Sequence, residues 1–380
     1  MTRVLIVGGG IGGVTAALAL ARKGIDAPVF EAAPQLRPVG KGIWVPTNAM
    51  QVLQRLGVAA AVTRAGWPLE RIQLRTLRGV LLDVDLRRYQ EMFGHTTISI
   101  HRAALLDALA GALPPGALRL GKRFVGFAED AGGVTARFDD GTEDRGDALV
   151  GADGIRSAVR EQLFPGVPLR YTGQTCYRGV TRMDLPPGLE HVCWEVWGGA
   201  CRFGFSAVGP GQVYWFAPVS APPGAPPPEG PLAGWLAEKY AGFPAPVSDV
   251  LRGKPEDEVI RTDLYDFAPV RQRCRGRVAL IGDAAHAMTP NLGQGGAQAV
   301  EDGCALAEKL AAGGPVGEAL RQYEALRLPK VRRLVKSAWR FGRMAHWRPR
   351  WLQALRNFVL RCTPRRLNER QLEWLYRLDY

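Results

Sequence analysis

The stretch VALIGDAAHAMTPNLGQGGAQAVED, from Val278 to Asp302, combines an apolar strand, an acidic corner and a glycine-rich turn. The strand, residues 277–281, ends at the pair Gly282-Asp283, and Pro290 and residues 293–296 then lead into an alanine-rich helix. The first turn of a helix offers unpaired N–H groups and a partial positive charge, and glycines let a flat ring approach the backbone. The stretch therefore predicts a place for a polar, partly anionic ligand. The alternative is an ordinary strand, turn and helix whose glycines only cap the helix.

The N-terminal segment predicts a strand, a turn, a helix and a second strand. The strand at residues 4–7 is followed by GGGIGG at residues 8–13, a helix at 14–23 and a strand at 27–30. The glycines fit the pattern GxGxxG, in which they permit the tight turn, the approach of a pyrophosphate and close packing of helix on strand. Glu31 follows the second strand, where an acidic side chain accepts hydrogen bonds from a ribose. This arrangement predicts a dinucleotide site and leaves NAD and FAD open.

A third corner of the same kind lies in the middle of the chain. The apolar strand at residues 148–152 ends at Asp153-Gly154, and a helix is expected over residues 155–160. A helix starting at His101 would carry Arg102 in its first turn, where the guanidinium could reach a diphosphate or be a solvated charge. Three strand ends with an acidic residue and glycine favour one shared site over three chance turns.

Residues 171–260 have a different character, with alternating strands rich in aromatic side chains. A proline-rich linker at 221–231 and a helix near 235–240 interrupt them, and the nucleotide-binding part resumes near Arg277. The pattern predicts a mostly antiparallel sheet inserted into the nucleotide-binding domain. Its aromatic face is either core or the wall of a pocket for a planar substrate.

Composition narrows the class of protein. The six cysteines have no metal-like spacing, so we expect reduced thiols in a cytoplasmic protein and no metal site. The N-terminal apolar run at residues 4–7 is too short for a signal peptide or a membrane span. Of the net charge of +13, fourteen Lys and Arg against three Asp and Glu lie in residues 330–380. Because the charge is local, we expect no nucleic-acid partner.

This basic tail reads as helices with leucine, valine, tryptophan and phenylalanine between the charges. The favoured interpretation is that the helices pack an apolar stripe on the body and expose their arginines. The alternative is a basic amphipathic surface that contacts anionic membrane or steers an acidic substrate.

The motifs GGGIGG at 8–13, GADGIRSAVR at 151–160 and GDAAHAMTPNLGQGG at 282–296 resemble those of the class A flavoprotein monooxygenases, the group of p-hydroxybenzoate, salicylate and urate hydroxylases. The resemblance covers roughly residues 1–330 and implies an α/β fold. In that fold a Rossmann-like FAD-binding domain carries an inserted, mostly antiparallel substrate sheet, and helices follow at the C-terminus. The expected domains are an FAD-binding domain of residues 1–71, 98–170 and 265–330, a substrate domain of residues 72–97 and 171–264, and a basic helical region of residues 331–380.

The resemblance also implies which residues bind FAD. The ADP half would lie against Gly8, Gly10, Gly13 and Glu31, and the diphosphate near Arg102 and Asp153; the further cofactor-binding residues would be Ile11, Gly12, Arg37 and Gly42. Asp153 belongs to a motif with a suggested role in handling NAD(P)H as well. Asp283 would bind ribityl or phosphate groups, and Pro290, Gly293, Gln294, Gly295 and Gly296 would lie along the isoalloxazine ring. The lysine at position 41 stands where a small residue is usual, so contacts there can differ.

Enzymes of this group reduce FAD with NAD(P)H and transfer one oxygen atom of O2 from a flavin C4a-hydroperoxide to the substrate. That chemistry needs a dry cavity and a substrate held over the ring. The resemblance implies hydroxylation or epoxidation of a hydrophobic, aromatic or polyene molecule, and we expect either a monomer or a homodimer. Arg202 and Tyr214 are the catalytic candidates, Arg202 as partner of an anionic oxygen or, alternatively, as a salt bridge of the sheet surface. Two other functions stay open: a flavin reductase or dehydrogenase, and a flavin-bound protein without turnover.

Overall fold

The computed structural model describes residues 2–36, 41–255 and 259–380. A six-stranded sheet in the order β19-β20-β12-β1-β2-β8 forms the centre of one half of the molecule. All neighbours in it are parallel except β19 and β20. The strands are β1 (Val4–Val7), β2 (Val29–Phe30), β8 (Leu118–Arg119), β12 (Ala148–Gly151), β19 (Cys274–Arg275) and β20 (Val278–Leu280).

Both faces of this sheet are covered, which explains why its strands are apolar throughout. Side chains alternate along a strand, so Val4 and Ile6 pack on one layer while Leu5 and Val7 pack on the other. The first layer holds α1 (Ile11–Arg22), α5 (Arg102–Ala110) and α10 (Gly295–Ala311). The second holds α6 (Ala158–Leu163) and a three-stranded antiparallel sheet of β9 (Phe124–Asp130), β10 (Gly133–Phe138) and β11 (Glu143–Gly146).

The other half of the molecule is built on an eight-stranded sheet with the main order β17-β13-β16-β15-β14-β5-β6, in which β18 also pairs with β13. Its pairs are antiparallel except β5 with β14. The strands are β5 (Arg71–Thr76), β6 (Gly79–Asp85), β13 (Leu169–Arg182), β14 (Val192–Gly198), β15 (Cys201–Gly209), β16 (Gln212–Ser220), β17 (Lys254–Pro255) and β18 (Ile260–Phe267). Helices α7 (Leu232–Lys239) and α8 (Val247–Arg252) pack against its aromatic side chains.

Smaller elements join the two halves. A three-stranded antiparallel sheet in the order β3-β7-β4 consists of β3 (Gly42–Val45), β7 (Thr97–His101) and β4 (Trp67–Leu69). The remaining short helices are α2 (Thr47–Arg55), α3 (Ala59–Ala65), α4 (Arg87–Phe93), α9 (Asp283–His286) and a 3-10 turn at Pro290–Leu292. The expected α/β fold, with a nucleotide-binding sheet, an inserted mostly antiparallel sheet and C-terminal helices, is confirmed.

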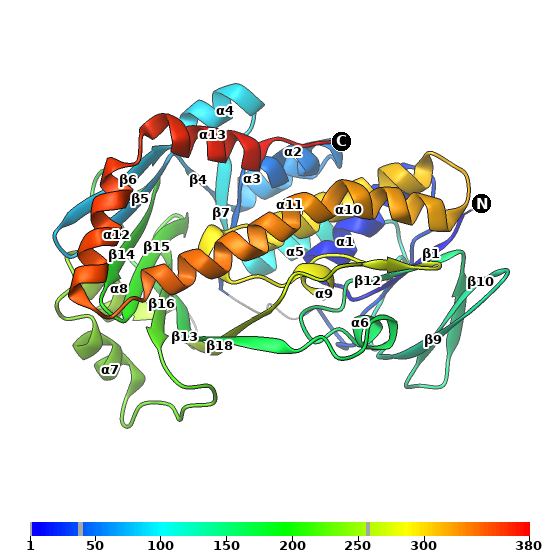
Figure 1. Cartoon of the computed structure of the whole chain (residues 1–380), viewed down its shortest axis with the longest axis horizontal. Helices are drawn as coiled ribbons and strands as arrows, with labels where there is room; N and C mark the ends of the chain where they lie inside the picture. Colours follow the sequence, from blue (N-terminus) through cyan, green and yellow to red (C-terminus); the bar gives the residue numbers. More distant parts are fainter. Residues whose placement is uncertain (1, 37–40, 256–258) are drawn as a thin grey trace.

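The C-terminal part of the chain connects both halves. Helix α11 (Val316–Ala345) runs from the nucleotide-binding sheet to the large antiparallel sheet, and α12 (Arg350–Cys362) and α13 (Arg365–Tyr376) turn back along the molecule (Figure 1). The side chains of Leu375 and Tyr376 pack with Tyr89 and Val331, so α13 closes over α4 and α11. In the described parts of the chain, no helix combines the length and apolarity needed to cross a membrane.

Candidate functional site

The three acidic and glycine-rich corners meet at one edge of the nucleotide-binding sheet. Strands β1, β12 and β20 are direct neighbours, and all three are parallel, so their carboxyl ends lie side by side. These ends lead into Gly8, Asp153 and Gly282-Asp283. A Cβ placed on Gly8 would lie 2.5 Å from the carbonyl oxygen of Ala152, which shows how closely the first two corners approach. The edge beyond the carboxyl ends of parallel strands is where such sheets bind ligands.

The first corner combines two glycines that the fold requires with one that leaves room for a ligand. Gly8 has a φ of +109°, and a Cβ on Gly13 would lie 1.9 Å from the oxygen of Gly8. A Cβ on Gly10, in contrast, has no described atom within 4 Å. Gly10 is also the N-cap of α1, where no described side chain caps the free amides. An open space at an uncapped helix N-terminus suits a pyrophosphate.

Glu31 faces the same turn. Its carboxylate accepts hydrogen bonds from the backbone N–H of Gly9 at 2.7 Å and from that of Ala33 at 2.8 Å. Each carboxylate oxygen has a second lone pair, so these bonds hold the side chain in place without using its capacity to accept a ribose hydroxyl. A ribose contact by Glu31 stays a prediction.

The second corner is held by its own helix start. Asp153 accepts hydrogen bonds from the hydroxyl of Ser157 at 2.5 Å and from the N–H of Val159 at 3.1 Å. Burial raises the pKa of the Asp153 carboxyl. Sequence reasoning missed Arg160, which is buried and donates to the carbonyl oxygens of Ala284 at 3.0 Å and Ile155 at 2.6 Å. Arg160 therefore links the second corner to the third.

The third corner exposes one acidic side chain and buries another. Asp283 is exposed at the start of α9. Asp302 of α10 is fully buried and accepts from the N–H of Gly282 at 3.1 Å, while its carboxylate lies 2.6 Å from Nε2 of His286. Asp302 thus fixes the turn that presents Asp283.

Next to this corner, a glycine-rich loop faces the small sheet of β3, β7 and β4. Gly293 has a φ of +62°, which favours glycine, and a Cβ there would lie 3.1 Å from the ring of Trp44. A Cβ on Gly296 would lie 2.9 Å from Ile43. Gln294 is buried and accepts hydrogen bonds from Asn48 at 3.1 Å and Gln298 at 3.0 Å. Pro290, at the start of this loop, is exposed. The side chains of Ile43 and Trp44 in β3 therefore lie directly against the backbone of this loop.

Beneath the loop lies a buried ion cluster that sequence reasoning also missed. Glu301 accepts from Asn48 at 2.6 Å and Lys330 at 3.1 Å and is paired with Arg327, which also donates to Asp302 at 2.8 Å. The only sequence signal was the pair Glu301-Asp302 on an otherwise apolar stretch of helix. Such residues are seldom buried unless they are paired, so these two required partners.

The remaining expected contacts come from the segment before α2 and from α5. Arg102 is exposed at the first position of α5, and its backbone N–H donates to the carbonyl of Lys41 at 3.0 Å. A Cβ on Gly42 would lie 2.2 Å from the ring of Tyr214. Gly42 therefore allows the nucleotide-binding half to lie directly against the large sheet. Arg37 lies outside the described residues.

Aromatic side chains line the large sheet where it meets β3. The ring centroids of Trp44 and Tyr214 each lie 6.1 Å from that of Phe216. The indole N–H of Trp44 donates to the hydroxyl of Ser206 at 3.1 Å, and this hydroxyl lies 2.9 Å from that of Ser99. Burial raises the pKa of Tyr214 to about 12, so its hydroxyl stays protonated at neutral pH. The wall is apolar with a few hydroxyl groups, and Tyr214 belongs to a small buried cluster with Val180 and Val208.

Arg202 lies behind this wall and is only 2% exposed. Its guanidinium donates to Asn291 at 2.7 Å, Glu195 at 3.0 Å and Gln174 at 3.3 Å, and its Nε donates to His346 at 3.0 Å. Arg202 thus contacts the glycine-rich loop through Asn291, a connection that the sequence did not indicate. A direct contact of Arg202 with a substrate stays a prediction.

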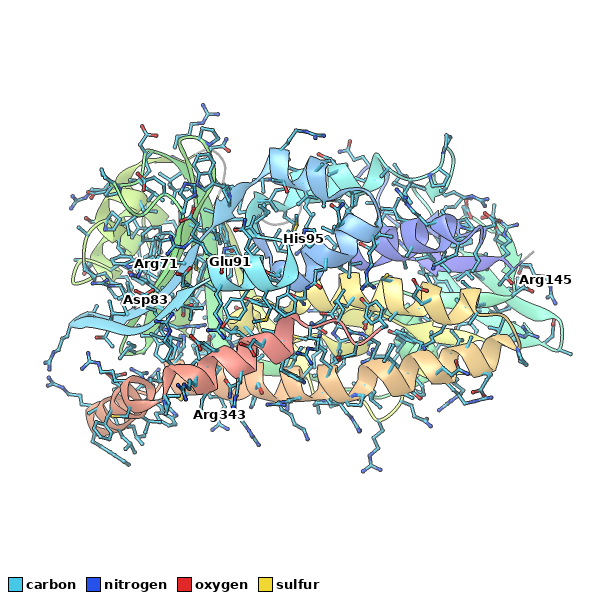
Figure 2. The ribbon with its side chains drawn as sticks, turned by 90° about the horizontal axis from the view of Figure 1, so that it is seen from above. Arg71, Asp83, Glu91, His95, Arg145 and Arg343 are labelled. Atoms are coloured by element: carbon cyan, nitrogen blue, oxygen red, sulfur yellow. The ribbon has the colours of Figure 1, made fainter. Side chains whose placement is uncertain are left out.

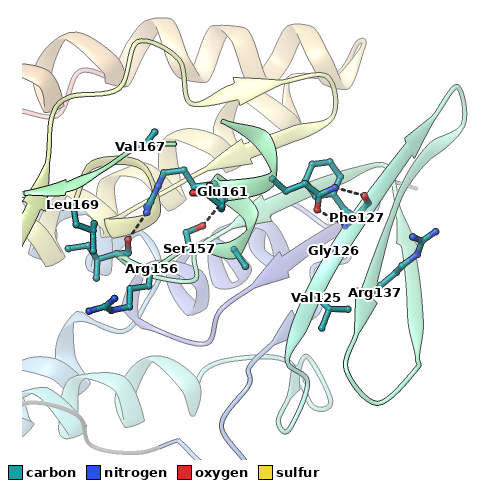
Figure 3. A pocket seen from close by; sticks show the side chains of 13 residues that line it. Val125, Gly126, Phe127, Arg137, Arg156, Ser157, Glu161, Val167 and Leu169 are labelled. Atoms are coloured by element: carbon teal, nitrogen blue, oxygen red, sulfur yellow. Dashed lines mark hydrogen bonds between the residues drawn. The ribbon is translucent and has the colours of Figure 1, made fainter. Parts of the chain in front are cut away.

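A cavity of about 910 Å³ lies beside the second corner, between α6 and the hairpin of β9 and β10 (Figure 3). Arg137, Arg156 and Arg160 line it together with one acidic residue, Glu161, and apolar side chains such as Val167 and Leu169. The arginines of this cavity therefore place positive charge beside the second corner.

The residues of this edge fit FAD. The room at Gly10, the uncapped start of α1 and the exposed carboxylate of Asp283 suit the dinucleotide, and the glycine-rich loop, which has no side chains at Gly293, Gly295 and Gly296, suits the approach of a flat ring. Fold and site together define a flavin-binding enzyme with a second, mostly antiparallel sheet.

The chain belongs to the FAD binding domain family, which matches residues 1–229 and 257–338, and within it to the class A flavoprotein monooxygenases. It is 41% identical to the aurachin C monooxygenase/isomerase of Stigmatella aurantiaca, with 90% of each chain covered. It is 34% identical to the 2-heptyl-3-hydroxy-4(1H)-quinolone synthase of Pseudomonas aeruginosa, with 97% of each chain covered. The solved structure of Klebsiella pneumoniae HpxO with FAD and uric acid is similar with a TM-score of 0.90 and 31% identity, covering 99% of this chain and 96% of that one. The family resemblance and the FAD cofactor expected from the motifs are confirmed.

Proposed function

We propose that this protein uses NAD(P)H and O2 to insert one oxygen atom into a fused heteroaromatic molecule with an apolar substituent, such as a 2-alkyl-4(1H)-quinolone. The observation that carries the proposal is the aromatic wall of Trp44, Tyr214 and Phe216. Trp44, in β3, brings this wall into contact with the glycine-rich loop at Gly293. The quinolone class is suggested by the name of one relative, and the uric acid bound by another is also a planar heterocycle.

Each part of the site has a role in this reaction. FAD, once bound and reduced, supplies the chemistry that activates O2. Trp44, Tyr214 and Phe216 exclude water and hold a planar ring, while the buried hydroxyl of Ser206, bonded to that of Ser99, fixes the indole of Trp44. The protonated hydroxyl of Tyr214 can donate to a substrate oxygen. Arg202 acts as a positioning residue, because it holds Asn291 and with it the loop along the ring.

The test is turnover of the FAD-loaded protein with NADH or NADPH, isotopically labelled O2 and three probes: a 2-alkyl-4(1H)-quinolone, uric acid and a hydroxybenzoate. We expect the quinolone to stimulate consumption of the nicotinamide cofactor and to gain one labelled oxygen atom. Stimulated consumption that yields only hydrogen peroxide would instead indicate a flavin reductase. Insensitivity to all probes would favour a flavin-bound protein without turnover.

We further propose that the phosphates of NAD(P)H dock at the arginine-lined cavity beside the second corner. Arg156 is exposed there and lies directly after the corner at Asp153-Gly154. A hydrogen bond between a guanidinium and a phosphate contributes about 1.5–3 kcal/mol, so Arg156→Gln should raise KM for the nicotinamide cofactor about tenfold or more.

The FAD content of Arg156→Gln should equal that of the wild type. The matched control is Arg145→Gln, because Arg145 is an exposed arginine of the neighbouring β11 that pairs with Asp130 and does not line the cavity. An unchanged KM in Arg156→Gln, or equal effects of both substitutions, would contradict this docking place.

A further inference from the structure

Helix α12 exposes an apolar face to solvent. Trp351, Leu355, Phe358 and Val359 are 68%, 51%, 66% and 53% exposed. Their spacing of four, seven and eight residues from Trp351 places them on one side of the helix. For these four side chains the expectation of an apolar stripe packed on the body is therefore wrong, because they point outward, whereas Leu360 packs on the body.

The side of α12 that faces the protein carries the buried Arg356 and the partly buried Leu360. Arg356 is buried, and its guanidinium donates to the carbonyl oxygens of Met344 at 3.0 Å and Ala345 at 3.3 Å at the end of α11. The same guanidinium lies 4.7 Å from the ring centroid of Trp197. These contacts fix the rotation of α12, so the outward direction of its apolar face is part of the fold.

A basic rim surrounds this face. Residues 340–370 contain nine arginines and a single acidic residue, Glu369. Arg343, Arg348, Arg350, Arg361 and Arg366 are exposed. In Figure 2 the C-terminal helices lie along one border of the molecule, with Arg343 labelled beside them. An apolar stripe within a basic rim is the pattern of helices that lie in the interface of an anionic membrane.

We propose that α12 docks this protein on an anionic lipid bilayer, with Trp351 and Phe358 inserted among the headgroups and the arginines on lipid phosphates. Charge complementarity selects this partner over a second copy of the chain. A symmetric pair would bring one arginine rim against another, with only Glu369 in the segment to compensate. The helix of 13 residues is about 20 Å long, which is too short to span a bilayer, so it lies flat in the interface. This surface is independent of the proposed function.

The test is sedimentation of the full FAD-loaded chain with vesicles of phosphatidylcholine alone or of equimolar phosphatidylcholine and phosphatidylglycerol. We expect binding only to the anionic vesicles, weakened by salt. The double variant Trp351→Ser, Phe358→Ser should bind at least ~10-fold more weakly, because two large apolar side chains no longer leave water. The double variant Arg361→Gln, Arg366→Gln should lose roughly fivefold for each arginine.

The matched control is Val125→Ser, which removes an exposed apolar side chain of β9 far from α12 in the sequence and should bind as the wild type does. Thermal unfolding and FAD content verify that each variant is folded. Wild-type protein that stays in the supernatant at low salt, or a Trp351/Phe358 variant that binds like the wild type, would overturn the proposal. A wild-type dimer that the same variant converts to monomer, without vesicle binding, would assign the face to a second copy instead.

Discussion

Gly10 and Gly13 lie in the same turn, but the fold requires a glycine only at position 13, whereas position 10 leaves room for a ligand. A Cβ on Gly13 collides with the backbone of Gly8, whereas a Cβ on Gly10 points into open space. We expect Gly10→Ala to keep the fold of the apoprotein but to weaken FAD binding at least ~10-fold, because the methyl group takes the place of a phosphate oxygen. Gly13→Ala should lower stability itself. Thermal unfolding of the apoprotein and titration with FAD separate the two effects.

Unchanged FAD affinity in Gly10→Ala would mean that the pyrophosphate does not lie at this turn. The reverse control is Gly116→Ala, a surface glycine with a φ of +76° and no described atom near its Cβ position, which should lower stability modestly and leave FAD binding unchanged.

Residues that shape the local backbone were predictable from the sequence, whereas side-chain pairs between distant segments were not. The turn glycines and Glu31 follow from local spacing, since their contacts lie within one βαβ unit. Arg160 bonded to Ala284, and Arg202 bonded to Asn291, join segments about a hundred residues apart. A sequence pattern carries no signal for such pairs until the fold brings them together.

Helix α10 depends on the charge of Asp302. Burial alone would raise the pKa of this carboxyl, but His286, Arg273 and Arg327 around it hold the pKa below its ordinary value. Asp302→Asn removes the carboxylate paired with buried Arg273 and leaves Arg327 paired with Glu301 alone, and breaking a buried pair typically costs about 3–5 kcal/mol. We expect that loss of unfolding free energy in urea, together with weaker FAD binding, because the single oxygen of Asn cannot accept both from the arginines and from the N–H of Gly282.

Glu308→Gln on the same helix is the control, because Glu308 pairs with Lys23 on the surface and its loss should change stability by less than about 1 kcal/mol. Equal stability of Asp302→Asn and wild type would show that the cluster does not hold the helix in place.

Strands that are buried on both faces were predicted well, whereas elements with only one buried face were predicted less well. Continuous apolar runs gave β1, β12 and β20 within a residue or two, because both faces of their sheet are covered. Helix α6 begins at Ala158, three residues later than expected, since Asp153 and Ser157 hold the preceding turn. The orientation of α12 escaped prediction because periodicity shows that an apolar face exists but not which way it points.

The two halves of the molecule are joined by the hydrogen-bond network around Arg202. Through it the large sheet contacts the glycine-rich loop at Asn291 and the end of α11 at His346. The Nε2 atom of His346 accepts the hydrogen bond from Arg202, so its proton is on Nδ1, 2.9 Å from the hydroxyl of Ser220. A neutral His346 is therefore required for the halves to keep this contact.

Burial and the neighbouring charge of Arg202 lower the pKa of His346 to about 3, from an ordinary value of 6.5. In the unfolded chain His346 binds a proton below pH 6.5, whereas in the folded chain it stays neutral until about pH 3. Stability from this residue is therefore complete above pH 6.5 and falls as the pH falls, by at most about 1.4 kcal/mol per pH unit. His346→Gln keeps a neutral hydrogen-bonding side chain but removes the titration. We expect the wild type to lose about 1–2 kcal/mol more than this variant between pH 7 and pH 5 in urea unfolding, and parallel stability curves would show that His346 is not held neutral between the two halves.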